Sequence, residues 1–231
     1  MPQYLATIKG ASFYLSEEET RHLKVARVKQ GQTIKIFDGK GKKYLAELSD
    51  FNGKEACGSI QSALPCVLPK RKITLCFCAI SRPATEDLLD KCTQAGVFAF
   101  RPVFSARSDA ELLKKWETKL SRWQQILTAA AKQCETPLIP QVYEPLSFSE
   151  AIKQAPKGII CYEDEHQTPL AAALATFKEN EDISIFIGPE GGFTEDEIKL
   201  AKQNGLLCVS LGSNILRAET ACTVACWAAL Q

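Results

Sequence analysis

Features that are absent limit the classes of protein that this sequence can encode. Its 231 residues include only two histidines, His22 and His166, and its ten cysteines form no Cys-x-x-Cys pair. A zinc site is therefore not expected, and no metal is assigned. No apolar run approaches the roughly 20 residues of a membrane-spanning helix. The first residues lack the pattern of a signal peptide, so we expect a cytoplasmic protein with reduced thiols and no membrane partner.

Charge is nearly balanced over the whole chain but not along it. The formal net charge is +1. Residues 1–70 carry 11 Lys and Arg against 7 Asp and Glu, a net of +4, and residues 71–231 carry 17 against 20, a net of −3. A basic first part is compatible with binding to nucleic-acid phosphates. A solvated lysine-rich surface explains the same distribution nearly as well.

The first part of the chain has the pattern of a small β domain. A short helix is predicted over residues 19–28, and alternating apolar and polar residues follow it. Asp38-Gly39-Lys40-Gly41 is a typical hairpin turn. We therefore expect residues 1–68 to form a small antiparallel barrel or sheet, with a proline-containing linker after it.

From residue 72 onward the pattern changes to alternating strands and helices. A continuous apolar strand at its start is typical of a parallel sheet that is buried on both faces. The domain over residues 72–231 is therefore expected to be an α/β sheet with helices on both faces. The strands are expected at 72–80, 97–105, 139–144, 158–163, 182–187 and 206–211, and the helices at 84–96, 110–134, 148–154, 194–205 and up to about 230.

An unusual glycine-rich turn follows the strand over 182–187. Gly188-Pro189-Glu190-Gly191-Gly192 stands directly before a helix whose Thr194 and Glu197 form a capping box. The turn does not match the consensus sequence of a dinucleotide-binding loop or of a P-loop. It is either a plain tight turn or a place where the backbone approaches a ligand, because ligands of open parallel sheets bind beyond the carboxyl ends of strands.

A second segment, LGSNILRAET, follows the last expected strand and contains Gly212, Arg217 and Glu219. Together with IGPEGGFTEDEI about twenty residues earlier, it resembles the signature of SPOUT-class RNA methyltransferases, and within that class the RsmE family. The segments HLKVARVKQGQTIKIFDGKG, KCTQAGV, PVFSARS and RWQQILTAAAKQC extend the resemblance over nearly the whole chain.

The resemblance implies a fold and an activity. It implies a PUA-like N-terminal β-barrel for RNA binding and a SPOUT α/β domain whose C-terminal part is threaded into a trefoil knot. It also implies S-adenosylmethionine-dependent methylation of N3 of a specific uridine during rRNA processing. The expected partners are 16S rRNA or the assembled small ribosomal subunit, and a second copy of the chain in a homodimer.

The resemblance and the expected chemistry together name site residues. Arg217 is expected to stabilise negative charge on O2 and O4 of the uracil, although it could instead only pair with Glu219 or Glu190. Leu211, Ile215 and Leu216 are expected to line an apolar slot for adenine. The catalytic candidates are Arg217 and Glu219; the cofactor-binding candidates are Tyr162, Glu163, Ile187, Gly188, Pro189, Glu190, Gly191, Leu211, Gly212, Ile215 and Leu216; the RNA-binding candidates are Arg21, His22, Lys24, Arg27 and Arg107.

Several points stay open at the level of sequence. The general base could be Glu163, Glu190 or Glu219, or water. The chain departs from the family pattern at Lys132, Asn214 and Ala218 and at Gln94-Ala95-Gly96. A non-catalytic RNA-binding protein with a degenerate cofactor site is one alternative, and a flavodoxin-like nucleotide-dependent enzyme is another.

The last helix predicts an interface. Residues 220–230 read TACTVACWAAL, with no charged residue, so this helix needs cover on most of its faces. Trp227 is the expected anchor of a homodimer. Alternatively, neighbouring helices of the same chain cover the helix.

Overall fold

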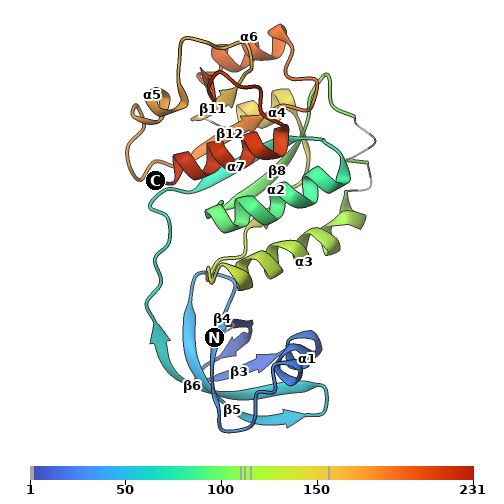
Figure 1. Cartoon of the computed structure of the whole chain (residues 1–231), viewed down its shortest axis with the longest axis vertical. Helices are drawn as coiled ribbons and strands as arrows, with labels where there is room; N and C mark the ends of the chain where they lie inside the picture. The colour runs from blue at the N-terminus through green and yellow to red at the C-terminus, as the bar shows by residue number, and fades with distance from the viewer. Residues whose placement is uncertain (1–2, 110, 112, 115, 156) are drawn as a thin grey trace. The chain divides into compact units, whose positions relative to one another are not determined.

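The computed structural model describes residues 3–109, 111, 113–114, 116–155 and 157–231. Their contacts divide the chain into two compact units, each built around one sheet (Figure 1). Unit 1 contains residues 1–68 and 128–139, and unit 2 contains residues 69–127 and 140–231. Each unit is therefore assembled from two separate stretches of sequence.

Unit 1 is a curled sheet with one helix. Its six strands lie in the order β1-β4-β5-β6-β3-β2. Although β1 and β2 are consecutive in the chain, they lie at opposite edges of this order, so the sheet must curl to bring its two edges together. The hairpin predicted at residues 38–41 joins β4 to β5 and is confirmed. The elements are β1 (Gln3–Leu5), β2 (Thr7–Lys9), β3 (Ser12–Leu15), α1 (Glu17–Val25), β4 (Thr33–Phe37), β5 (Lys43–Asn52) and β6 (Glu55–Leu64).

The helix of unit 1 begins two residues before its predicted start. Ser16 is the N-cap of α1, and its side chain accepts a hydrogen bond from the backbone N–H of Glu19. A serine at this position satisfies one of the free N–H groups of the first turn. The helix buries Leu23 in the apolar core of the curled sheet, together with Phe13, Ile34 and Ile36.

Unit 2 contains a seven-stranded sheet in which all the pairs are parallel. The strand order is β10-β8-β7-β12-β11-β13, and β9 also pairs with β8. The predicted parallel sheet is therefore confirmed. Its strands are β7 (Ile73–Cys78), β8 (Ala99–Phe104), β9 (Gln141–Val142), β10 (Leu146–Ser147), β11 (Gly158–Cys161), β12 (Ile183–Ile187) and β13 (Leu207–Val209).

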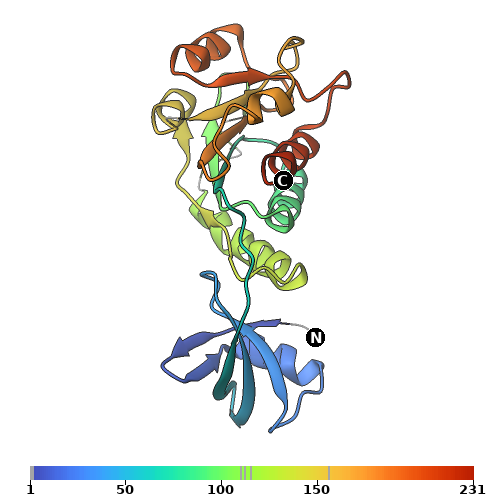
Figure 2. The same ribbon diagram turned by 90° about the vertical axis from the view of Figure 1, so that its left-hand side faces the viewer.

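Helices cover both faces of this sheet, as predicted (Figure 2). On one face, α2 (Arg82–Ala95) packs beside α7 (Ala218–Ala229), and α7 also contacts β7 and β12. On the other face, α4 (Phe148–Lys153) and α6 (Glu195–Gln203) enclose a core with Phe186 and Phe193. A short helix, α5 (Leu170–Leu174), lies against α7 and β13. The knot stays an expectation of the family resemblance.

Helix α3 is shorter than predicted. It spans Glu117–Gln133, whereas the apolar spacing predicted a helix over 110–134. Residues 110, 112 and 115 lie outside the described residues. Leu113 and Trp116, which were assigned to the helix, lie in turns before it, where Trp116 N donates to Leu113 O. Leu113 is nevertheless buried at 3% exposure, so the apolar spacing predicted burial correctly but not the backbone conformation.

The cysteines behave as small core residues. All ten thiols are free. The pairs expected on one face of a strand or helix, Cys76 with Cys78 and Cys222 with Cys226, are buried at 2% exposure or less. Within the described ranges, no helix has the length and apolar character needed to span a bilayer. The same residues contain no cluster of three or more His, Cys, Asp or Glu side chains able to hold a metal ion.

Candidate functional site

Three neighbouring strands end at one edge of the unit 2 sheet. Strands β12, β11 and β13 are adjacent and parallel, so the loops that follow them leave the sheet at the same edge. The backbone of two of these loops is joined directly: Tyr162 N donates to Val209 O at 3.0 Å, and Ser210 N donates to Thr168 O at 2.9 Å. The segments singled out in the sequence therefore meet at the carboxyl edge of the sheet.

The glycine turn after β12 uses its glycines for different purposes. Gly192 has φ +69°, and a Cβ there would lie 1.8 Å from Oε1 of Glu163, so this position accepts only glycine without rearrangement. A Cβ on Gly191 would meet only Arg107, at 3.5 Å, which is ordinary contact. Gly192 thus makes the tight turn, while the exposed Gly191 presents its backbone at the surface.

The loop after β13 is open to solvent. Gly212 has φ +119°, and apart from its chain neighbours no atom of the described residues lies within 4 Å of the position of a Cβ. Leu211 and Leu216 are half-buried, as expected for side chains that line a slot. Ile215 is 88% exposed, so its side chain is not enclosed by this chain. Exposed glycine backbone beside half-buried leucines suits a flat, partly apolar ligand.

Arg217 is available for a substrate. It is the N-cap residue of α7, and its carbonyl accepts from Ala221 N at 2.8 Å. Among the residues that the structure describes, no carboxylate lies within ion-pair distance of Arg217. Its role at the substrate stays a prediction. Glu219 lies half-buried in the first turn of α7, where a negative charge is favourable.

The loop after β11 is held by a carboxylate. Glu165 Oε1 accepts hydrogen bonds from Gln167 N at 2.8 Å and from Thr168 N at 3.2 Å. The bond from the Gln167 N–H contributes most to lowering the pKa of Glu165. In the same loop, burial raises the pKa of Tyr162, and its hydrogen bond with Asp164 adds to this effect. Glu165 therefore serves to shape the loop, while Glu163 and His166 are exposed.

A fourth segment, after β8, also reaches this edge; the sequence named its Arg107 only as an RNA-binding candidate and did not predict its contact with the glycine turn. Buried Glu197 accepts from Thr194 N at 2.8 Å, as the capping box predicted, and its other oxygen accepts from Ala106 N, also at 2.8 Å. The guanidinium of Arg107 donates to the carbonyl of Gly191 at 2.8 Å. These partners lie more than 80 residues apart in sequence, where no local pattern indicates a contact.

The RNA-binding candidates lie in both units. Arg21, His22 and Lys24 lie on α1, and Arg27 follows the helix with φ 56°. Arg107 belongs to unit 2. The structure therefore brings four of the five candidates together.

Lys132, one of the departures from the family pattern, has a partner in unit 1. Its ammonium lies 2.7 Å from the buried carboxylate of Glu19 and 3.0 Å from Nδ1 of His22. The substitution therefore supplies a cation for a carboxylate that the fold buries.

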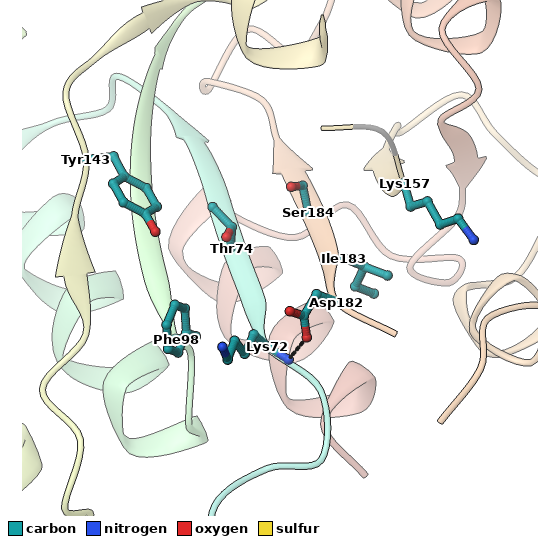
Figure 3. A pocket seen from close by; sticks show the side chains of 8 residues that line it. All are labelled: Lys72, Thr74, Phe98, Tyr143, Lys157, Asp182, Ile183 and Ser184. Carbon is teal, nitrogen blue, oxygen red and sulfur yellow. Dashed lines mark hydrogen bonds between the residues drawn. The ribbon is translucent and has the colours of Figure 1, made fainter. Parts of the chain in front are cut away.

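A hollow lies at the opposite edge of the sheet. It has a volume of about 470 Å³ and is lined mainly by residues at the starts of the strands (Figure 3). At its rim, the backbone N–H of Lys72 donates to Asp182. We place the functional site at the carboxyl edge instead, because the loops of three strands meet there and ligands of open parallel sheets bind at that edge. The lining residues are Lys72, Thr74, Phe98, Tyr143, Lys157, Asp182, Ile183 and Ser184.

Comparison with known proteins shows which family the chain resembles. Residues 67–230 match the family model described as an RNA methyltransferase domain, and residues 15–61 match an RNA methyltransferase PUA domain. The chain is 36% identical to ribosomal RNA small subunit methyltransferase E of Synechocystis sp., over 87% of this chain and 67% of the relative. It is 29% identical to the protein of that name from Mesomycoplasma hyopneumoniae, over 96% and 95% of the two chains.

A solved structure extends the comparison to the fold. Ribosomal RNA small subunit methyltransferase E from Neisseria gonorrhoeae, bound to S-adenosyl methionine, superposes with a TM-score of 0.86, at 29% identity and over 98% of this chain and 95% of that one. Unit 2 thus has the SPOUT methyltransferase fold and unit 1 the PUA-like fold, and the flavodoxin-like alternative is wrong. The chain belongs to the ribosomal RNA small subunit methyltransferase E (RsmE) family of RNA methyltransferases.

Proposed function

We propose that this protein uses S-adenosylmethionine to methylate N3 of a specific uridine in the 16S rRNA of the small ribosomal subunit. The observation that carries the proposal is the meeting of three loops at one sheet edge, with exposed glycine backbone and with Arg217, which has no ion pair among the described residues. The Neisseria relative, bound to S-adenosyl methionine, supports the choice of cofactor.

The cofactor would be held by backbone and apolar groups. Tyr162 and Glu163, the backbone of residues 187–191 and the loop of residues 211–216 are the proposed contacts. The open space beside Gly212 fits this assignment, since in the part of the chain that the structure describes no atom beyond its chain neighbours lies within 4 Å of a Cβ built there. Leu211 and Leu216 would face the adenine. When bound, the cofactor supplies an electrophilic methyl group on a positively charged sulfur.

Side chains of this protein would help to deprotonate the uridine and stabilise its anion. N3 of uracil must lose its proton before its lone pair can form a bond to carbon, and the charge then spreads over O2 and O4. Arg217 would stabilise this charge, in the way that a preorganised donor stabilises an oxyanion. The proton would pass to Glu163, Glu190 or Glu219, or to water. The new N–C bond forms as the S–C bond breaks.

Arg217→Ala provides a test of this role. Removing a donor of this kind typically lowers kcat by about 10²- to 10³-fold. We expect the variant to bind S-adenosylmethionine with an unchanged Kd in calorimetry and to lose methylation of small-subunit rRNA. Mass mapping of rRNA from cells that lack the protein should show the loss of one N3-methyluridine. A wild-type protein that binds RNA but shows no affinity for the cofactor would favour the non-catalytic alternative.

The N-terminal domain, predicted as residues 1–68, is proposed to bind RNA through α1. Arg21 and Lys24 are exposed, and the ion pair of Arg21 with Glu17, at 3.9 Å, is a weak surface pair. Because each phosphate contact releases counterions, Arg21→Ala with Lys24→Ala should weaken RNA binding and flatten its salt dependence. The full chain should be tested, since residues 128–139 belong to the same compact unit. An unchanged salt slope would remove α1 from the interface.

We also propose a homodimer that forms through α7. One face of this helix is buried against the sheet and α2, but Trp227 is 57% exposed and Val224 42% exposed. Neighbouring helices of this chain therefore leave this apolar face uncovered. Trp227→Glu should give folded monomers that no longer methylate RNA. Light scattering of the wild type at micromolar concentration gives the decisive mass: a value near the 25.4 kDa of one chain would contradict the dimer.

A further inference from the structure

The segment that follows β8 is docked on the glycine turn at two points. Its backbone forms a closed turn, in which Ser108 Oγ donates to Ser105 O at 2.8 Å and accepts from Ser105 N at 2.9 Å. From this turn, Ala106 N donates to the buried carboxylate of Glu197, and Arg107 Nη1 donates to the carbonyl of Gly191. The turn thereby fixes the direction in which the Arg107 side chain leaves the backbone.

The peptide group between Gly191 and Gly192 is held at both ends. Its carbonyl oxygen accepts from Arg107 at 2.8 Å, and its N–H donates to Pro189 O at 2.9 Å. The aliphatic stem of Arg107 also covers one side of Gly191, because its Cβ and Cδ lie 3.5 and 3.6 Å from the position that a Cβ of residue 191 would take. A glycine has no side chain that would otherwise restrict this peptide, so these two bonds set its orientation.

We propose that Arg107 is a positioning residue for the cofactor: it holds the glycine turn in the conformation that receives S-adenosylmethionine. This inference rests on the proposed function of that loop. It differs from the role expected for Arg107 in the sequence, which was a contact with RNA. An RNA contact requires RNA to be present, whereas a positioning role affects cofactor binding by the protein alone.

The test is calorimetric titration of S-adenosylmethionine into the full chain without RNA. Arg107→Ala should raise the Kd about tenfold, which corresponds to the loss of one hydrogen bond from a charged donor. Arg107→Lys should recover part of the affinity, because an ammonium can reach the same carbonyl. The matched control is Arg101→Ala, which removes an arginine whose guanidinium lies over Tyr143 and donates to Glu144 O, and it should leave the Kd unchanged.

Kinetics separate positioning from a loss of structure. Arg107→Ala should raise KM for S-adenosylmethionine, with little effect on KM for RNA or on Tm. If the wild type binds the cofactor and the Kd of Arg107→Ala lies within twofold of the wild-type Kd, this inference is overturned and the proposed function is not. A higher KM for RNA would then assign Arg107 to RNA binding. A wild type with no affinity for S-adenosylmethionine would instead overturn the proposed function.

Discussion

Replacing Gly192 by alanine should destabilise the protein much more than the same change at its neighbour Gly191. Both substitutions add one methyl group to the same turn. Both also remove a glycine from the unfolded chain, so the change in the conformational entropy of the unfolded chain is the same for the two variants. The difference between the two variants therefore reports on the folded state alone.

Two costs act at Gly192. An alanine at φ +69° pays roughly 1–2 kcal/mol for a left-handed conformation. The new methyl group would also lie 1.8 Å from Oε1 and 2.8 Å from Cδ of Glu163. Because the side chain of Glu163 is exposed, it can turn away, at a cost of about 1 kcal/mol for a less favourable rotamer. The expected loss in unfolding free energy is about 2–3 kcal/mol.

At Gly191 neither cost applies. This residue has no positive φ, and its added methyl group would make ordinary contacts with Arg107 at 3.5 and 3.6 Å. The expected change for Gly191→Ala is within about 0.5 kcal/mol of zero.

Urea unfolding followed by circular dichroism measures the stability change of both variants. The same two substitutions in a protein that also carries Glu163→Ala separate the two costs. In a Glu163→Ala protein, the contact at Gly192 is absent and the backbone cost remains, so Gly192→Ala should cost about 1 kcal/mol less there. Equal losses for Gly191→Ala and Gly192→Ala would refute the reasoning from the turn geometry. An unchanged loss in the Glu163→Ala background would refute the contact term only.

Three other predictions concern buried groups. Lys132→Met should lower the unfolding free energy by about 3 kcal/mol, because it leaves the carboxylate of Glu19, which is 5% exposed, without its cation. Adding Glu19→Gln to this variant should restore much of the lost stability. Urea titrations that give equal losses for the single and the double variant would contradict this prediction. Burial raises the pKa of three thiols to about 12, so stability should fall as pH rises above about 9, where the same thiols ionise only in the unfolded chain. Iodoacetamide at pH 8.5 should label the half-buried cysteines well before the buried ones, as read by peptide mass mapping, and early labelling of the latter would contradict their burial. The three thiols with a pKa raised to about 12 are Cys76, Cys78 and Cys161, and the half-buried cysteines are Cys57, Cys66 and Cys134.

The sequence by itself determined the secondary structure wherever the signals are local. A capping box depends on residues three apart, so Thr194 and Glu197 predicted the start of α6 correctly. Gly96 ended α2 as predicted, because it takes the left-handed conformation with φ 99° that favours glycine. The continuous apolar strand after residue 72 predicted a sheet covered on both faces. Local pattern was weaker for α3, where the apolar spacing continued into turns that bury Leu113 without a helix.

Only the tertiary structure decided which residues meet across long separations. Arg107 reaches Gly191 and Ala106 reaches Glu197 because β8 and β12 both flank β7 in the sheet, although more than 80 residues separate each pair. Residues 128–139 belong to the N-terminal unit, although a division at residue 68 assigns them to the other domain. They join it because Gln3 donates to the carbonyl of Ala131 and because the backbone of this segment bonds to the hairpin at Gly39. Periodicity records which face of an element is apolar, and it carries no information about the element that packs on that face. The role of each glycine in the turn after β12 depends on such neighbours: a Cβ at Gly192 would meet the carboxylate of Glu163 at a positive φ, whereas a Cβ at Gly191 would make ordinary contacts with the side chain of Arg107.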